Sequence, residues 1–129
     1  LYEDDIICDQ PLDNLLSDLV REQVLMNTRE EVPHSVAVMI DRIEDRPVQR
    51  NSDKKSNTGI LATIYVERKS QKGILIGKGG AMLKKIGKGA RLQIQKLIDG
   101  PVYLELFVKV VPHWRSKPAR LSELGYEGN

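Results

Sequence analysis

Four consecutive residues near the middle of the chain, Gly77-Lys78-Gly79-Gly80, have the composition of an anion-binding turn. Glycine has no Cβ, so the backbone at such positions can approach a phosphate closely. The residues that follow have a helical pattern, and the first N–H groups of a helix are unpaired and carry a partial positive charge. Lys78 adds a full positive charge at the tip. The turn is therefore a candidate phosphate site, and the surrounding spacing decides which kind.

Two common phosphate-binding motifs do not fit this segment. A P-loop needs the spacing G-x-x-x-x-G-K-S/T. Here the distance from Gly73 to Gly77 is one residue short, and Gly79 stands where a magnesium-binding hydroxyl is required. A dinucleotide fingerprint needs G-x-G-x-x-G, and Met82 occupies its third glycine position. We therefore expect this chain neither to bind nor to hydrolyse GTP.

A third motif, the G-x-x-G turn of a KH domain, does fit. It joins two helices and clamps four nucleotides of single-stranded nucleic acid. Ile74 and Ile76 precede the turn and Ile86 follows it. Some of these apolar residues can floor a groove for bases, while others anchor the helices in the core. Because G-x-x-G is short, a simple connector between two helices remains the alternative.

The charge distribution favours a polyanionic partner. The whole chain carries 20 Lys and Arg against 18 Asp and Glu. Residues 1–31 contain nine acidic and two basic residues, whereas residues 68–98 contain nine basic residues and no acidic one. A contiguous basic block is typical of a nucleic-acid surface, although a solvated helix face would also carry lysines. The block consists of Arg68, Lys69, Lys72, Lys78, Lys84, Lys85, Lys88, Arg91 and Lys96.

Length and composition exclude several other classes of protein. The 129 residues, 40% of them hydrophobic, suffice for one modest core. No apolar run approaches the roughly 18 residues of a membrane span, so we expect a soluble domain. Cys8 is the single cysteine, and His34 and His113 have no partners at metal-ligand spacing. We therefore expect no catalytic residue and no metal site. Since the chain starts at Leu1 and has no signal-peptide pattern, we expect a piece of a longer protein.

The N-terminal third of the chain predicts a helix. Asp9 or Gln10 can cap a helix that begins at Pro11, where the missing N–H of proline is not needed. It should run to about residues 28–31, because the residue before Pro33 avoids helical geometry. Its apolar stripe consists of Leu12, Leu15, Leu16, Leu19 and Val20.

Three segments alternate between apolar and polar residues and predict strands. They are Ser35–Ile43, Gly59–Arg68 and Val102–Val110. We expect the first two to pair antiparallel across Glu44–Thr58, a polar segment that we expect to be a mobile loop.

Three further helices are expected around the glycine turn and at the C-terminus. Ser70–Leu75 precedes the turn, Ala81–Ile98 follows it, and Arg115–Leu124 comes last. Gly87 and Gly89 weaken the long helix, which a close neighbour would explain. The inner face of that helix consists of Leu83, Ile86, Ala90, Ile94 and Leu97. The predicted fold class is α+β, with a three-stranded sheet covered on one face by helices.

Beyond the turn, the chain resembles the Era GTPases. Residues 74–91 (ILIGKGGAMLKKIGKGAR) resemble the type II KH core of that family. The resemblance continues in REQVL (21–25), EVPHSVAV (31–38), PVYLELFVKV (101–110), Trp114 and Leu124-Gly125-Tyr126. It implies a type II KH domain over residues 1–129, with an extension at about 1–10 and a closing helix at about 115–125. The GTP-binding domain of that family would lie before Leu1, so GTP and Mg²⁺ are expected only there.

The resemblance also implies a function. Era-like proteins assist assembly of the small ribosomal subunit, and their KH domain binds the 3′ end of its ribosomal RNA. The expected RNA-binding residues are Gly77, Lys78, Gly79, Gly80, Ile74, Ile76, Lys72, Lys84, Lys85 and Ile86. The expected partners are single-stranded RNA and the small ribosomal subunit, with a peripheral membrane association of the longer parent protein. The chain itself is expected to be a cytoplasmic monomer, or organellar if the parent is eukaryotic. The alternatives are a KH module of another RNA-binding or ribosome-associated protein and a protein-interaction domain that uses the open sheet face.

Overall fold

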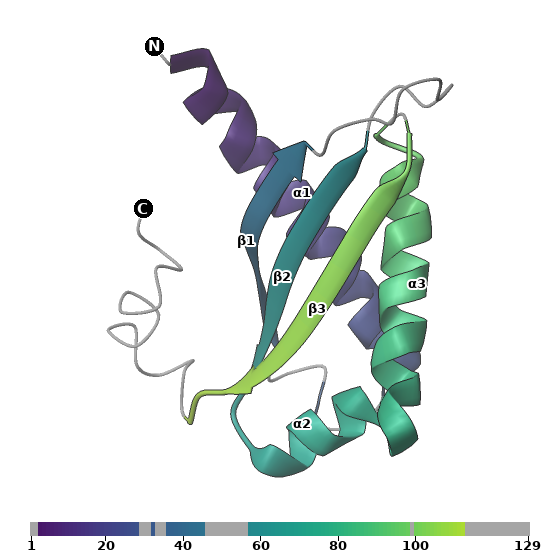
Figure 1. Ribbon diagram of the computed structural model, residues 1–129. Coiled ribbons are helices and arrows are strands. Elements are labelled where there is room, and N and C mark those ends of the chain that lie inside the picture. The colour runs from purple at the N-terminus through teal and green to yellow at the C-terminus, as the bar shows by residue number, and fades with distance from the viewer. Residues whose placement is uncertain (1–2, 29–31, 33–35, 46–56, 99, 113–129) are drawn as a thin grey trace.

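The computed structural model describes residues 3–28, 32, 36–45, 57–98 and 100–112 (Figure 1). The expected C-terminal helix and most of the expected loop lie outside these residues. No helix in the described ranges is long and apolar enough to cross a membrane. The elements are α1 (Glu3–Asn27), β1 (Ala37–Asp45), β2 (Thr58–Val66), α2 (Lys69–Ile76), η2 (Lys78–Gly80), α3 (Ala81–Gln95) and β3 (Val102–Val110).

The three strands form one mixed sheet in the order β1-β2-β3. β1 and β2 pair antiparallel, as the sequence predicts. β2 and β3 pair parallel and in unbroken register from Thr58↔Val102 to Val66↔Val110. A parallel pair needs a crossover connection, and α2, η2 and α3 together provide it (Figure 1). The glycine turn therefore lies within this crossover.

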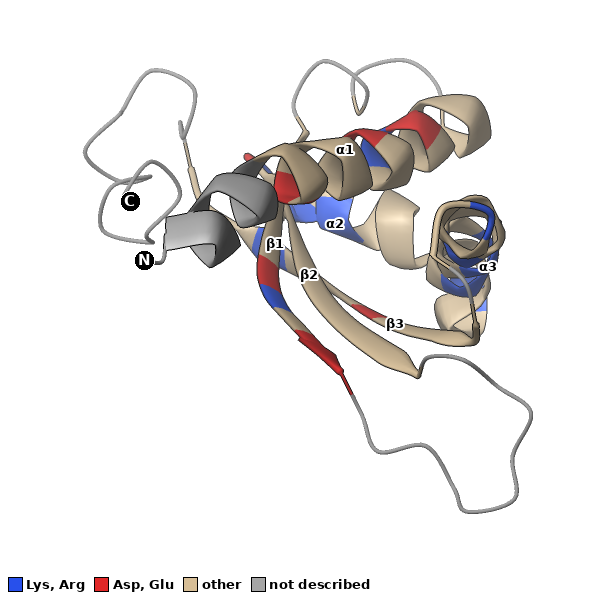
Figure 2. Cartoon of the chain, turned by 90° about the horizontal axis from the view of Figure 1, so that it is seen from above, with Lys and Arg blue, Asp and Glu red and all other residues tan. Residues whose placement is uncertain are grey.

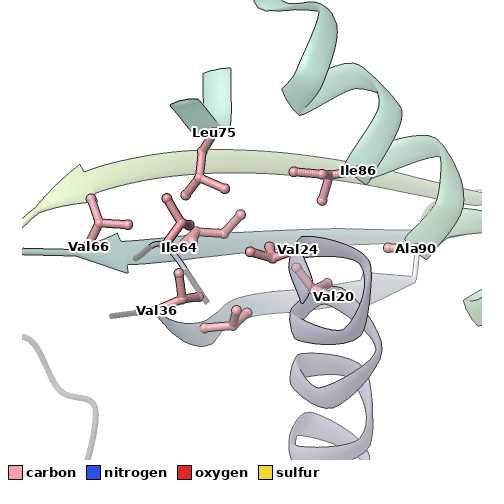
Figure 3. Packing of buried hydrophobic residues seen from close by; sticks show 10 residues of the cluster. Val20, Val24, Val36, Ile64, Val66, Leu75, Ile86 and Ala90 are labelled. Atoms are coloured by element: carbon pink, nitrogen blue, oxygen red, sulfur yellow. The ribbon is translucent and has the colours of Figure 1, made fainter. Parts of the chain in front are cut away.

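The helices cover one face of the sheet, which confirms the α+β architecture. Val20 and Val24 of α1, Leu75 of α2, and Ile86 and Ala90 of α3 meet in one cluster and are completely buried (Figure 3). Val38, Ile64 and Val66 of the strands, and Val36 just before β1, belong to the same cluster. Burying each such aliphatic side chain contributes about 1.5–3 kcal/mol. This core fixes α2 and α3, and with them the turn.

The predicted start of the first helix is wrong. α1 begins at Glu3, and Pro11 lies inside it rather than at its first position. A proline inside a helix removes one N–H donor and its ring crowds the carbonyl group four residues earlier, at a cost of about 3 kcal/mol. α1 continues across Pro11 nonetheless. The predicted inner stripe is confirmed in part: Leu16 and Val20 are buried, whereas Leu15 is 43% exposed.

The predicted strand boundaries shift by a few residues. β1 continues through Glu44 to Asp45, and β2 begins at Thr58, so the polar loop is shorter than predicted. The register of β1 shifts between Ile40 and Arg42. Such a bulge inserts one extra residue into a strand. With this extra residue, Ile40 and Ile43 both pack against the same buried cluster although they are three residues apart.

The end of the long helix also differs from the prediction. α3 ends at Gln95, and Leu97, predicted on the inner face, is 54% exposed. The Lys96 N–H donates to the Gln93 oxygen at 3.2 Å, a three-residue bond that tightens the last turn. The tighter turn rotates Leu97 out of the apolar stripe. Ile86, Ala90 and Ile94 are completely buried, as predicted.

Candidate nucleic-acid interface

The glycine turn has a backbone that only glycine adopts easily. The φ angles of Gly77, Gly79 and Gly80 are 74°, 63° and 81°. Residues with side chains rarely adopt positive φ values. The Gly77 N–H donates to the Gly73 oxygen at 2.8 Å, and the Gly80 N–H donates to the Gly77 oxygen at 3.2 Å. Two hydrogen bonds thus hold the turn between α2 and α3.

The three glycines differ in what surrounds them. A Cβ at Gly77 would lie 2.6 Å from the Cβ of Met82, so the start of α3 packs directly against this position. A Cβ at Gly79 or Gly80 would meet no heavy atom within 4 Å. Lys78, which precedes Gly79, is exposed. Gly77 therefore closes the turn internally, while Gly79, Gly80 and Lys78 present an open outer surface.

A buried glutamine fixes the first of the two helices. The Oε1 atom of Gln71 accepts hydrogen bonds from the N–H groups of Glu67 at 3.0 Å and Arg68 at 2.9 Å. Gln71 is only 2% exposed. The amide therefore ties the end of β2 to the first turn of α2, which positions the glycine turn at the other end of α2.

A groove runs from the turn between α3 and β3. Its first part, of about 490 Å³, is lined on the α3 side by Gly80, Leu83, Lys84, Gly87, Lys88 and Arg91. Its second part, of about 750 Å³, extends to Gln95 and Pro101. Both parts share Arg91, Leu104 and Glu105. The two parts are therefore one continuous depression along the edge of the sheet.

The β3 wall of the groove offers backbone hydrogen-bonding groups. The Thr58 N–H donates to the Pro101 oxygen, and the Val111 N–H donates to the Val66 oxygen. The backbone N–H and C=O groups of the odd-numbered residues of β3 therefore point toward β2. Alternate residues of an edge strand point their N–H and C=O groups away from the sheet. The Val102 N–H accordingly bonds to Gln95 of α3 at 3.2 Å. By the same alternation, the backbone groups of Leu104 and Leu106 face the groove, where bases could bond to them.

Charge is segregated across the molecule. Basic residues lie mainly on α2 and α3, and acidic residues on α1 and β1 (Figure 2). Lys84, Lys88 and Arg91 line the groove together with a single acidic residue, Glu105. Because the groove is positively charged and α1 and β1 are negatively charged, a polyanion is attracted to the groove and repelled from α1 and β1.

The structure brings part of the predicted site together. Gly80 and Lys84 line the groove, and Gly77 to Gly79 lie at its end. Ile74 is 42% exposed on α2, whereas Ile86 is completely buried and can only anchor α3. Lys72 and Ile76 are half-buried, and Lys85 is exposed. Neither lysine lines the groove, so their roles in RNA binding stay predictions.

Several groove residues are not among the RNA-binding residues expected from the sequence. On α3 they are Leu83, Gly87, Lys88 and Arg91, and on β3 they are Leu104, Glu105 and Leu106. Residues three and four apart share a helix face, and continuing that spacing from Gly80 would have found the α3 members. The β3 members had no signal, because only folding brings that edge beside α3.

The opposite face of the sheet shows different chemistry. Tyr103 and Phe107 of β3 are 46% and 50% exposed there. The Thr63 hydroxyl donates to Asp41 at 2.6 Å. Burial, and then the negative charge of Asp41, raise the pKa of the Tyr65 phenol. No group of three or more His, Cys, Asp or Glu in the described ranges could hold a metal ion.

The order α1-β1-β2-α2-α3-β3, with a mixed sheet covered on one face by helices and a G-x-x-G turn between α2 and α3, is that of the type II KH fold. Residues 31–115 match the KH domain family. The chain therefore belongs to this family.

Relatives with similar sequences include GTPases named Era. The GTPase Era of Nostoc sp. (strain PCC 7120) is 60% identical over 125 residues, which cover 97% of this chain and 36% of that protein. The GTPase Era of Mycobacterium avium is 46% identical, with 97% and 40% covered. The KH domain of this chain matches the C-terminal part of Era GTPases. The chain thus spans well under half the length of these relatives.

Two solved Era structures have the same fold as this chain. A variant of Aquifex aeolicus Era bound to GDP·AlF4⁻ superposes with a TM-score of 0.77 at 45% identity, covering 90% of this chain and 37% of that one. Era in complex with MgGDPNP and nucleotides 1506–1542 of 16S ribosomal RNA superposes with a TM-score of 0.76 at 46% identity, covering 92% and 37%.

Proposed function

We propose that this chain is the RNA-binding domain of an Era-like GTPase and that it binds the 3′ end of small-subunit ribosomal RNA during assembly of the subunit. The observation that carries the proposal is the continuous groove that begins at the G-x-x-G turn and is basic along the part next to it. The Era protein solved with 16S ribosomal RNA supports the choice of RNA.

Each part of the interface has a distinct physical role in this proposal. The open surface at Gly79 and Gly80 lets phosphates approach the backbone N–H groups at the start of α3. Lys78, Lys84 and Lys88 neutralise phosphate charge along the strand. Leu83 and Leu104 provide an apolar floor for unstacked bases, whose edges can bond to the β3 backbone.

The wider organisation follows from the same proposal. Residues 1–129 form a single RNA-binding domain that needs no metal or nucleotide of its own. Its segments include the extension at about 1–10 and the closing helix at about 115–125. GTP and Mg²⁺ belong to the GTPase domain of the longer protein, which acts in a bacterial cytoplasm or an organelle. That longer protein also contacts the small ribosomal subunit and associates peripherally with the membrane, while the chain alone is monomeric.

The test is a double substitution at the turn, Lys78→Asp with Gly79→Asp. Both positions are exposed, and aspartate tolerates the left-handed backbone of Gly79 better than most residues. Two carboxylates there repel phosphate and block the close backbone approach. Losing these charge-assisted contacts costs about 2–4 kcal/mol, which is roughly a 30- to 1,000-fold loss of affinity. A titration with single-stranded RNA, with a thermal melt of the same samples, measures both effects.

A matched control changes the net charge equally but elsewhere. Lys109→Asp with Lys96→Asn also removes three units of positive charge, at two exposed positions that do not line the groove. We expect this control to bind RNA within a few-fold of the unaltered chain. Equal affinity of the turn variant and the unaltered chain, with unchanged melting, would rule out the turn as the binding site.

A further inference from the structure

The far part of the groove differs in chemistry from the part beside the turn. Near the turn the charged lining residues are Lys84, Lys88, Arg91 and Glu105, a net positive set. At the far end Arg91 is still present, but Lys84 and Lys88 are not among the lining residues. Its lining combines the apolar residues Ile60, Pro101 and Val102 with polar groups, among them Gln95, and slightly more of its surface is polar than apolar. A phosphate gains less in such a pocket than beside the turn, whereas a neutral, flat, polar group fits it.

One guanidinium in this pocket is held in a fixed orientation. The Nη1 atom of Arg91 donates to the Oε1 atom of Gln95 at 3.2 Å. The same oxygen accepts from the Val102 N–H at 3.2 Å, so the glutamine is itself anchored to the buried start of β3. A guanidinium has five N–H donors in one plane. Among the described residues, this bond to Gln95 is the only hydrogen bond of the Arg91 side chain, so the remaining donors can bind a ligand.

We propose that the far end of the groove is a guanine pocket, in which Arg91 binds the O6 and N7 acceptors of one guanine in the RNA. The inference rests on the proposed function and adds a base preference to it. Arginine bidentate to guanine is the commonest specific contact between proteins and bases. Gln95 is the positioning residue, because it sets the plane of the guanidinium. Lys84 and Lys88 line the near part of the groove but not this end, so a phosphate meets less positive charge here than beside the turn.

The pocket lies far enough from the turn to bind a nucleotide other than those that the turn clamps. Arg91 follows Gly80 by eleven residues, about 16 Å along the helix axis at 1.5 Å per residue. The turn clamps four nucleotides, and the pocket lies beyond it in the same groove. The RNA must therefore carry the guanine toward one end, with the flanking nucleotides running back to the turn.

The experiment measures binding of this chain to single-stranded oligouridine of about ten nucleotides, longer than the four that the turn clamps. One guanosine is placed at the 5′ end, in the middle or at the 3′ end. We expect it to raise affinity about five- to 100-fold at one end only. If the guanosine is at the opposite end of the oligonucleotide, placing it in the pocket directs the other nucleotides away from the turn, so affinity should not rise. Inosine, which keeps O6 and N7, should retain the gain, and 7-deazaguanosine, which lacks N7, should lose much of it.

Two protein variants test whether Arg91 causes the guanosine preference. Arg91→Lys keeps the charge but loses the planar fork, so the ratio of the affinity for guanosine-containing RNA to the affinity for plain oligouridine should fall to about one. Lys88→Ala is the matched control in the near part of the groove. It should weaken binding of every RNA equally and leave the preference intact. If Arg91→Lys fails to fold, the comparison of guanosine with 7-deazaguanosine on the unaltered chain still decides.

The outcomes separate this inference from the function on which it rests. Oligouridine binding that depends on Lys78 and Gly79 but shows no guanosine preference overturns the pocket and leaves the function standing. A preference that survives Arg91→Lys, or an equal loss for all RNAs in that variant, also overturns it, since another group or a phosphate is then bound. If no RNA binds at all, both proposals fall.

Discussion

At the scale of single residues, the three glycines of the turn should respond differently to substitution. Gly77 combines φ 74° with ψ 178°, a region that is essentially restricted to glycine, and its Cβ would collide with Met82. We expect Gly77→Ala to lose about 3 kcal/mol of unfolding free energy, from strain and overpacking together. Gly79→Asn should lose less than about 1 kcal/mol, because asparagine tolerates the left-handed conformation. Urea denaturation of both variants measures the difference.

Equal stability of these two variants would show that Met82 does not pack against the turn as described. The comparison also bears on function, because only Gly79 presents an open surface. A stable Gly79→Asn variant separates the role of this glycine in RNA binding from any role in folding.

At the scale of elements, two glycines within α3 should also behave differently. A Cβ at Gly87 would lie 3.6 Å from the Leu106 Cδ1 atom, an ordinary contact. Gly87→Ala should therefore stabilise the domain by about 0.5–1 kcal/mol through helix propensity. A Cβ at Gly89 would collide with the side-chain amide of Gln23, which is buried between α1 and α3. Gly89→Ala should be less stable than Gly87→Ala by about 1–3 kcal/mol.

A double variant tests the cause of that difference. If the amide of Gln23 is the obstacle, Gly89→Ala should become favourable in a Gln23→Ala background. Measured unfolding free energies that add independently would contradict a direct contact between α1 and α3 at this point.

The elements also show how far the sequence determines the fold. Alternation along β2 and β3 and the three- and four-residue spacing of α3 predict the buried side chains, because each pattern belongs to one local geometry. The start of α1 was not predicted, because proline is common at the first position of a helix, whereas Pro11 lies inside α1. The bulge near Asp41 was not predicted either, because pairing with β2, rather than the local sequence, selects it.

The candidate site also has one part that the sequence predicts and one part that it does not. The glycine turn is a local feature, so the sequence predicts its position and backbone. The groove is a tertiary feature, because Arg91 of α3 and Leu104 of β3 meet only when the crossover closes. The parallel pairing of β2 with β3 places that free edge beside α3.

At the scale of the whole molecule, the separation of charge should make RNA binding depend on salt. Lys78, Lys84, Lys88 and Arg91 lie along the turn and groove, while the acidic residues lie mainly on α1 and β1 (Figure 2). If about three to five phosphates are neutralised, the logarithm of the affinity should fall with the logarithm of salt concentration with a slope of roughly −2 to −3.5. Titrations at several salt concentrations measure it. A slope near zero would mean that the basic block is only a solvated surface.

The most direct test of the account is a map of where RNA touches the chain. Backbone amide signals of the isotope-labelled chain would be followed by NMR during titration with single-stranded RNA. We expect the largest shifts between Gly77 and Arg91 and along Leu104 to Leu106, with little change on α1 and on the exposed sheet face at Phe107. Shifts concentrated on α1, or on the sheet face that carries Phe107, would contradict the groove as the RNA-binding site.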